Sequence, residues 1–293
     1  MATMTFDGQF SDLQMKIMSE SALQAIYPEL VRIQDFAKSF SEAEATPGTA
    51  IVVPVYDFSE ASNFDATSNN YCSGTNEISA SNVQLSVHIH KAVKVTARDI
   101  AETGINFLKD ATAGIASILG RGINKYVFGQ MTEANLPLSA SVNLSSKAGA
   151  TSLYQIAAEN GLDVADSVVV LNPEEYAKLL QHVDFMQYGG TEAIRYGYVP
   201  GFVGFKSVVC STYLPAGVKG VIINRNSVGI AGRTLPVIPG AYPSTWVTND
   251  PNSGLPIRWR YFNTLCDGAF NLDGEVIIGT GIFYNGTKAV RLV

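Results

Sequence analysis

Charged residues are scarce in this sequence. Asp, Glu, Lys and Arg make up 16% of its 293 residues, whereas about a quarter is usual for a soluble globular protein. Ser, Thr, Asn, Tyr and Phe are frequent instead. A surface poor in Lys and Glu but rich in uncharged polar and aromatic groups is typical of surfaces buried against other subunits. We therefore expect an oligomer.

Cysteine is scarce as well, and long apolar runs are missing. Cys72, Cys210 and Cys266 are far apart and form no C-x-x-C pair, which argues against a disulfide framework or a zinc knuckle and favours a reducing compartment. No run of 18 apolar residues occurs, and the opening MATMTFDGQF lacks a cationic start followed by an apolar stretch. We expect neither a membrane-spanning chain nor one secreted by that route.

Basic residues are outnumbered, 20 against 26 acidic ones, so the formal net charge is −6. This balance argues against a protein whose main task is to grip nucleic acid, because neutralising phosphates needs clustered Lys and Arg. A container for DNA stays possible, since enclosed nucleic acid can carry its own counterions. The 46% hydrophobic content is enough for a core and excludes general disorder.

The first half of the sequence predicts a helix, two strands joined by a polar tip, and a second helix. Apolar residues between Leu13 and Phe36 recur at helical spacing, with a break expected at Pro28. An apolar strand over 50–56 precedes a Ser- and Asn-rich loop over 57–82, and apolar and polar residues then alternate over 83–90. The two strands and the loop predict an extended arm.

The second predicted helix follows a capping-box-like Thr96 and Asp99 and reaches about Met131, with glycines that favour kinks. Beyond it, a buried strand over 167–171 leads into a short helix opened by Asn172 and Pro173. Further strands are expected at 206–211, 220–224, 258–266 and 275–284, and an Asn-Gly turn at 285–286 should lead into a final hairpin strand at 287–292. Regular helical crossovers are missing, which favours a mixed α+β fold.

This order of elements resembles the Hong Kong 97 type capsid fold of the major capsid proteins of tailed double-stranded-DNA bacteriophages. The first matching segments are IVVPVYDF, KAVKVT and ARDIAETG, which precede the long helix. DSVVVLNPEEYAKLL, EAIRYGYVPGFVGFKSVVCSTYLPAG and VIINRNSVGIAGR are similar to the family's axial domain, and the closing run from RWRYFNTLC to AVRLV is similar to its final strands. The resemblance covers roughly residues 45 to 293.

The resemblance implies an α+β chain with an N-terminal arm, an extended β-loop, a long spine helix, a peripheral domain and an axial domain. The implied division is 1–45 for the arm, 46–96 for the extended loop, 97–150 for the spine helix and peripheral domain, 151–235 for the axial domain, and 236–293 for return strands of the peripheral domain. The segment 52–96 would lie over a neighbouring subunit. Phe64 and Tyr71, the large apolar groups of its polar tip, are our candidate intersubunit contacts.

The implied function is a structural subunit that assembles into hexamers and pentamers of an icosahedral phage head around double-stranded DNA. Implied partners are further copies of the chain, a scaffold, a portal, decoration proteins and DNA bound without sequence specificity, and no membrane. Assembly would take place in the host bacterial cytoplasm and the product would be the virion. An encapsulin-type nanocompartment shell shares the fold and is the alternative, and a soluble hydrolase is an alternative of another class.

Two other residue patterns could indicate a metal site, but each has a simpler structural explanation. His88 and His90 share one strand face and could be half of a metal site, but the polar face of a half-solvated strand suffices. Asp57, Glu60 and Asp65 lack the spacing of a calcium loop and fit a solvated loop.

Two further patterns have no catalytic interpretation either. Gly279 and Gly281 lack the third glycine and the helix of a dinucleotide loop, and nothing selects His182 as part of a triad. We assign no catalytic, cofactor-binding or metal-binding residue. One interpretation of the cations Arg32, Lys38, Arg121 and Lys125 is contact with packaged DNA, but a solvated helix face or pairing with acidic loops of other subunits fits the acidic chain better.

Overall fold

The computed structural model describes residues 12–40, 50–56, 78–96, 98, 106–181, 198–225, 227–236, 244–250, 254–264 and 269–293. The helices are α1 (Asp12–Gln34), α3 (Asn106–Gly129), α4 (Lys147–Glu159) and α5 (Pro173–Leu180), with a 3-10 turn η1 (Tyr284–Gly286). The strands are β1 (Ala37–Phe40), β2 (Ala50–Tyr56), β3 (Ile78–Thr96), β4 (Ser139–Ala140), β5 (Ser167–Leu171), β6 (Tyr198–Pro200), β7 (Ser207–Cys210), β8 (Gly220–Asn224), β9 (Val228–Arg233), β10 (Ser244–Asn249), β11 (Pro256–Thr264), β12 (Ala269–Ile282) and β13 (Ala289–Leu292).

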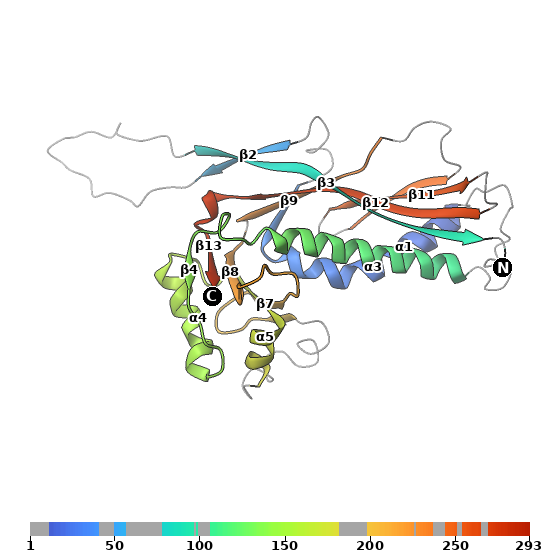
Figure 1. The fold of residues 1–293 in the computed structure, drawn as a ribbon. Helices are drawn as coiled ribbons and strands as arrows, with labels where there is room; N and C mark the ends of the chain where they lie inside the picture. Colours follow the sequence, from blue (N-terminus) through green and yellow to red (C-terminus); the bar gives the residue numbers. More distant parts are fainter. Residues whose placement is uncertain are drawn as a thin grey trace.

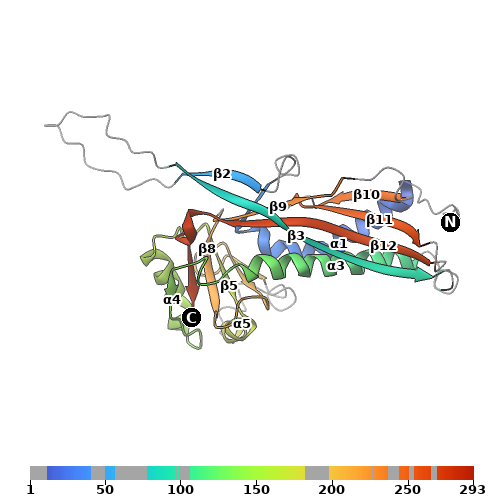
Figure 2. The same cartoon turned by 45° about the horizontal axis from the view of Figure 1, so that its top comes forward.

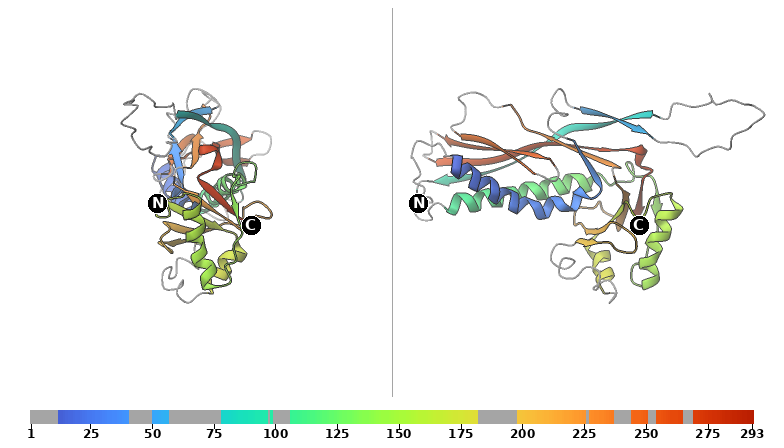
Figure 3. Two further views of the ribbon diagram at one scale, coloured as in Figure 1. Left: turned by 90° about the vertical axis from the view of Figure 1, so that its left-hand side faces the viewer. Right: turned by 180° about the vertical axis from the view of Figure 1, so that it is seen from behind.

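These elements form an elongated body and a smaller unit at one end of it (Figure 1). The body is a sheet with the order β1-β9-β12-β11-β10, to which β3 adds along β12 and β2 adds along β3. Helices α1 and α3 lie side by side along one face of this sheet (Figures 1 and 3). The smaller unit is a second sheet, β4-β13-β8-β5-β7-β6, flanked by α4 and α5.

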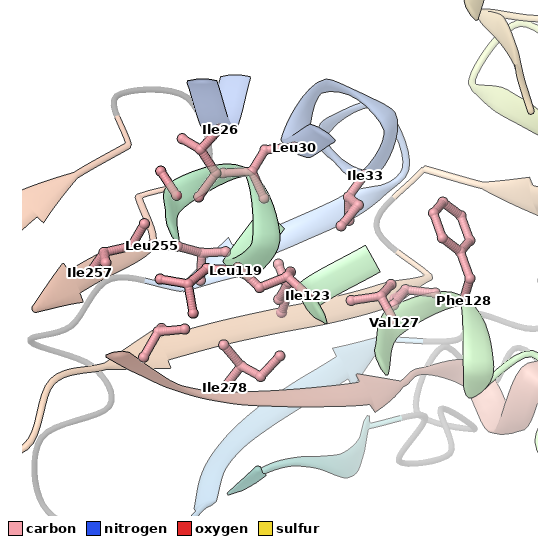
Figure 4. Close-up of a cluster of buried hydrophobic side chains, with 14 of the residues drawn as sticks. Ile26, Leu30, Ile33, Leu119, Ile123, Val127, Phe128, Leu255, Ile257 and Ile278 are labelled. Carbon is pink, nitrogen blue, oxygen red and sulfur yellow. The ribbon is translucent and has the colours of Figure 1, made fainter. Parts of the chain in front are cut away.

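The core of the body lies between the two helices and the long sheet (Figure 4). Ile26 and Leu30 of α1 meet Leu119 and Ile123 of α3, all nearly inaccessible to solvent, and Ile278 of β12 closes the layer from below. Each such side chain contributes roughly 1.5–3 kcal/mol of burial free energy. The helices approach so closely that a Cβ at position 120 of α3 would stand 2.9 Å from the Cβ of Glu29.

Burial of its flanks also explains why α1 continues through Pro28, where the sequence predicts a break. Proline in a helix interior removes one backbone hydrogen bond and costs about 3 kcal/mol. Ile26 and Leu30 flank it and are fully buried against α3, so packing offsets that cost. The break predicted at Pro28 is therefore wrong.

The ribbon formed by β2 and the first part of β3 extends past the body (Figure 2). Strand β3 carries one extra residue, Ser86, between its partners Leu85–Gly279 and Val87–Ile278. The resulting bulge changes which face the apolar side chains occupy. Val83 and Leu85 pack against the apolar cluster under the ribbon, whereas Val87 and Ile89 pack on the helix side.

The sequence-based strands at 50–56, 167–171 and 220–224 are confirmed, as is the helix that Asn172 caps by accepting a 2.8 Å hydrogen bond from the amide of Glu175. The prediction that 287–292 forms a hairpin with the preceding strand is wrong. Strand β13 follows the turn at Asn285 and Gly286 but pairs with β8 and β4 of the smaller sheet, not with β12. An Asn-Gly pair favours a tight turn, and both residues have a positive φ here. It does not determine with which strand the following segment pairs.

Two strands belong to sheets other than those that the domain limits implied by the resemblance would suggest. Strand β9, within 151–235, pairs with β12 and β1 of the long sheet. Strand β13, within 236–293, belongs to the smaller sheet. The chain thus passes between the two units more than once, and this connects them covalently at several points.

Candidate intersubunit surfaces

The β2–β3 ribbon has one buried face and one exposed apolar face. Val53 and Val55 are 5% and 4% exposed and pack on the cluster that includes Phe40 and Phe283. On the opposite face, Val52, Tyr56 and Ile78 are 65%, 51% and 53% exposed, and Tyr56 pairs directly with Ile78 across the two strands. A ribbon whose two faces are both apolar, with only one of them covered within the chain, is suited to contact another molecule.

A groove lies beside β1 and β2 and is lined by residues from both faces of β2. It has a volume of about 590 Å³ and is lined by Lys38 and Phe40 of β1, by residues 51–56 of β2, and by Phe283 and Tyr284. Among the described residues, β2 pairs only with β3 and β1 only with β9, so each strand leaves one edge unpaired. Unpaired strand edges are templates for an added strand.

An ionic network lies on the face of the long sheet that points away from the helices. Side chains alternate between the two faces of a strand, and Gly274 of β12 faces α3, because a Cβ there would meet Ile115 and Leu119. Its neighbours Asp273 and Glu275 therefore point to the opposite face. Both carboxylates are almost fully buried there, at 3% and 2% exposure.

Cations from the adjacent strand β11 neutralise these carboxylates. Arg258 forms an ion pair with Glu275, and its guanidinium also donates to the carbonyl oxygen of Leu235 at 2.6 Å. Arg260 pairs with Asp273 and reaches Glu275 at 2.8 Å. Burial raises the pKa of the Asp273 carboxyl, and the hydrogen bond and charge of Arg260 oppose that shift.

His88 and His90 lie at the exposed rim of this network. The Nε2 atom of His88 is 3.1 Å from a carboxylate oxygen of Glu275, and the Nδ1 atom of His90 is 4.0 Å from one of Asp273. The two imidazoles share one strand face, and each faces a carboxylate that already has an arginine partner. The part of the chain that the structure describes contains no group of three or more His, Cys, Asp or Glu side chains arranged to hold a metal ion.

Polar contacts of Asp35 join the end of α1 to the smaller unit. Asp35 pairs with Lys206 at 3.1 Å and accepts a 2.7 Å hydrogen bond from the fully buried Ser207. Lys206 also donates to the Asp35 carbonyl oxygen at 3.1 Å. These contacts stabilise the position of the smaller unit relative to the helices.

The candidate contacts Phe64 and Tyr71 lie outside the described residues. The same holds for Asp57, Glu60, Asp65, Cys72, His182 and Cys266. Cys210 is a free, half-buried thiol whose pKa is raised by burial.

The four cations considered for DNA binding lie on three elements, Arg32 on α1, Lys38 on β1, and Arg121 and Lys125 on α3. Arg121 is 3.9 Å from Glu29 and donates to Ser117, whereas Lys38 lies in the groove over the ring of Phe40. Lys125 is exposed on α3 and Arg32 is half-buried on α1.

The glycines at 279 and 281 serve strand pairing. A Cβ at Gly279 would stand 2.1 Å from the carbonyl oxygen of Gln84 on β3, and one at Gly281 would stand 2.7 Å from that of Asn82. Both residues lie inside β12. This geometry agrees with our interpretation of this stretch as a strand with small residues.

Sequence reasoning missed the ionic network, although a signal for it exists. Arg258 and Arg260, Asp273 and Glu275, and His88 and His90 are each two residues apart, the spacing that places both members on one face of a strand. The pairs are separated by up to 187 positions along the chain. Only the register of β3, β12 and β11 brings them together.

No family model matches the chain, and no curated protein matches it. Several solved structures match the chain in fold. A chain of the capsid of the cyanophage P-SCSP1u is 15% identical, with a TM-score of 0.53 over 88% of this chain and 85% of that one. A chain of the virus-like particle from Pyrococcus furiosus is 12% identical, with a TM-score of 0.57 over 95% and 98%.

A chain of the capsid of an empty gene transfer agent (GTA) particle is 13% identical to this chain. Its TM-score is 0.56 over 100% of this chain and 93% of that one. The chain therefore has the fold of these shell-forming proteins, a mixed α+β fold, as its order of elements predicts.

Proposed function

We propose that this protein is the major capsid protein of a tailed bacteriophage, a structural subunit that assembles with further copies of itself into a closed icosahedral shell. The observation that carries the proposal is the ribbon: an arm that extends from the body and exposes Val52, Tyr56 and Ile78. Leaving such apolar groups in water is unfavourable, and covering them against a neighbour recovers roughly 25 cal/mol per Å². The low charge of the whole chain supports the same conclusion.

The proposed assembly state, location and partners follow from the resemblance to the Hong Kong 97 type capsid fold. The subunits would form hexamers and pentamers and would be located in the virion after assembly in the host cytoplasm. Scaffold, portal and decoration proteins would be further partners, and the enclosed double-stranded DNA would be held without sequence specificity. The domain limits and the role of Phe64 and Tyr71 as intersubunit contacts stay predictions of the same kind.

A role without catalysis is supported by the character of the groove. Among the described residues that line it there is neither a histidine nor a carboxylate. Among the described carboxyl groups, Asp273 has a pKa raised by burial; it lies in the ionic network beside Arg260 and is not among the residues that line the groove. A hydrolase would need a shifted acid or base inside a cleft. None of the described helices is both long and apolar enough to cross a bilayer.

The proposal is tested by expressing the chain in bacteria and examining the purified product by electron microscopy. We expect closed shells or capsomer rings. Measuring nuclease-protected DNA in those shells separates the two cargo hypotheses: protected DNA supports a phage head, whereas shells that enclose protein and no DNA favour a nanocompartment. A product that stays monomeric, even with a scaffold protein supplied, would contradict the shell function itself.

A further inference from the structure

His88 and His90 lie on the outer face of the long sheet because of the bulge at Ser86. Ahead of the bulge Leu85 packs under the ribbon, and beyond it Ile89 packs on the helix side. Side chains alternate along a strand, so the extra residue turns positions 88 and 90 away from the helices. The bulge thereby places two imidazoles, 43% and 64% exposed, above the ionic network.

A buried carboxylate stands behind each ring. Nε2 of His88 lies 3.1 Å from Oε2 of Glu275, and Nδ1 of His90 lies 4.0 Å from Oδ1 of Asp273. This Asp273 oxygen is buried and accepts no hydrogen bond from the residues that the structure describes. An ionised carboxylate can only accept a hydrogen bond, so it favours the tautomer that carries the proton on the facing nitrogen. Nδ1 of His88 and Nε2 of His90 then keep their lone pairs for another partner.

This arrangement is the one that supports metal-binding histidines. A ligating imidazole usually donates its other N–H to a carboxylate, which fixes the tautomer and the ring orientation and makes the ligand more basic. The centroids of the His88 and His90 rings are 5.8 Å apart. That separation allows one ion between the rings to bind a nitrogen of each at about 2.0–2.1 Å.

The number of ligands is limited to these two imidazoles. Arg258 and Arg260 already engage the carboxylates of Glu275 and Asp273, and the described residues contain no group of three or more His, Cys, Asp or Glu side chains that could hold a metal ion. Water would therefore complete the coordination. A structural zinc site has four protein ligands, so an ion held by two should exchange with solution.

The donor atoms also select the kind of ion. Imidazole nitrogens suit zinc, copper and nickel, whereas magnesium and calcium bind through oxygen ligands. Both histidines stand on a paired strand, with His90 directly opposite Glu275 in the register between β3 and β12. A strand holds ligands more precisely than a loop does.

We propose that His88 and His90 form an exchangeable binding site for a divalent transition-metal ion of the zinc, nickel and copper class. The two imidazoles are the ligands, and Glu275 and Asp273 are positioning residues that hold the rings from behind. The site is complete within one chain apart from water. It therefore does not depend on the proposed shell function.

Calorimetric titration of the purified full-length chain with Zn²⁺ tests the site. We expect one ion bound per chain. His88→Gln and His90→Gln each keep an exposed polar side chain on β3 but remove a ligand, so each should weaken binding by more than about tenfold, the least that losing a supporting partner costs such sites. The matched control is His182→Gln, which changes the third and last histidine of the sequence and should leave the affinity unchanged.

A second variant tests the positioning role. Asp273→Asn keeps the shape of the side chain and removes its charge, and it should weaken Zn²⁺ binding about tenfold while one ion is still bound. Circular dichroism confirms that this variant is folded, and if it is not, the two histidine variants still decide the proposal. In a parallel titration with Ca²⁺, we expect no binding that His88→Gln removes.

The proposal is overturned if the unchanged chain binds no Zn²⁺, or if binding survives both histidine changes at the original affinity. A loss of affinity in His182→Gln equal to that in His88→Gln would overturn it too. An unchanged affinity in Asp273→Asn would remove the positioning role of that carboxylate. All titrations use the free subunit, so none of these results bears on shell formation, which electron microscopy tests separately.

Discussion

The body and the ribbon use apolar side chains in opposite ways. In the body, Leu119, Ile123 and Ile278 are all fully buried within one chain. In the ribbon, Val52, Tyr56 and Ile78 remain at least half exposed. The subunit's stability therefore resides in the sheet-on-helix body, whereas the outer apolar face of the ribbon stays exposed to solvent. Changes in the body should therefore act on folding, and changes in the ribbon on assembly.

The largest loss of stability should follow removal of an arginine from the ionic network. Arg258→Ala removes one of the two arginines paired with Glu275, which is 2% exposed, and breaking a buried pair in this way costs about 3–5 kcal/mol. Urea unfolding of the subunit measures the loss. The control is Arg121→Ala, because the Arg121 side chain is 57% exposed and lies 3.9 Å from Glu29, so this pair should contribute under about 1 kcal/mol. If both variants lost the same free energy of unfolding, burial of the ionic network would not contribute to its effect on stability.

A cavity in the body should have the next largest effect. Leu119→Ala removes a fully buried side chain between α1 and the sheet, and such changes cost about 2–5 kcal/mol. Ile118→Ala on the same helix is the matched control, because Ile118 is 43% exposed and its truncation should cost under about 1 kcal/mol. Thermal and urea unfolding should rank the two in this order. The reverse order would contradict the placement of the core.

Replacing the polar tip of the ribbon should spare the fold and stop assembly. A short Gly-Ser turn in place of residues 59–75 removes Phe64 and Tyr71, our candidate contacts, but no part of the described core. We expect a melting temperature within a few degrees of the original and no closed shells in electron micrographs. Normal shells from the shortened chain would refute the contact role of the tip, and outright unfolding would assign it to the core.

The smallest effect on stability is expected on the outer face of the ribbon. Val52→Ser combined with Tyr56→Ser changes two exposed positions, so the free energy of unfolding should move by no more than about 0.5 kcal/mol. The yield of assembled particles in a sucrose gradient should fall sharply. Tyr154→Ser, a half-exposed tyrosine on α4, is the control. An unchanged yield would show that this face is not an intersubunit contact.

The sequence predicted those helices and strands that depend on neighbouring residues alone. The Asn172 cap followed by Pro173 fixed the start of α5, and the alternation at 83–90 indicated a strand. Packing between distant segments decided the rest. Burial of α1 against α3 overrode the break expected at Pro28, and the bulge at Ser86 divided one alternating strand between two faces.

The surfaces were predictable only in part. The polarity and length of the loop after β2 indicated an extended arm, and the strand pair that carries it is present. The groove was not predictable, because β1 and β2 are connected through β9, β12 and β3, and β9 and β12 lie far along the chain from all three other strands. The ionic network needed the register between β3, β12 and β11 for the same reason.

Sedimentation velocity of the purified chain, over a range of protein and salt concentrations and with a scaffold protein supplied, tests the central claim most directly. The account predicts a conversion of free subunits into rings or closed shells as concentration rises, because covering the ribbon's apolar face offsets the entropy lost on association. A single compact monomer under every condition would contradict it.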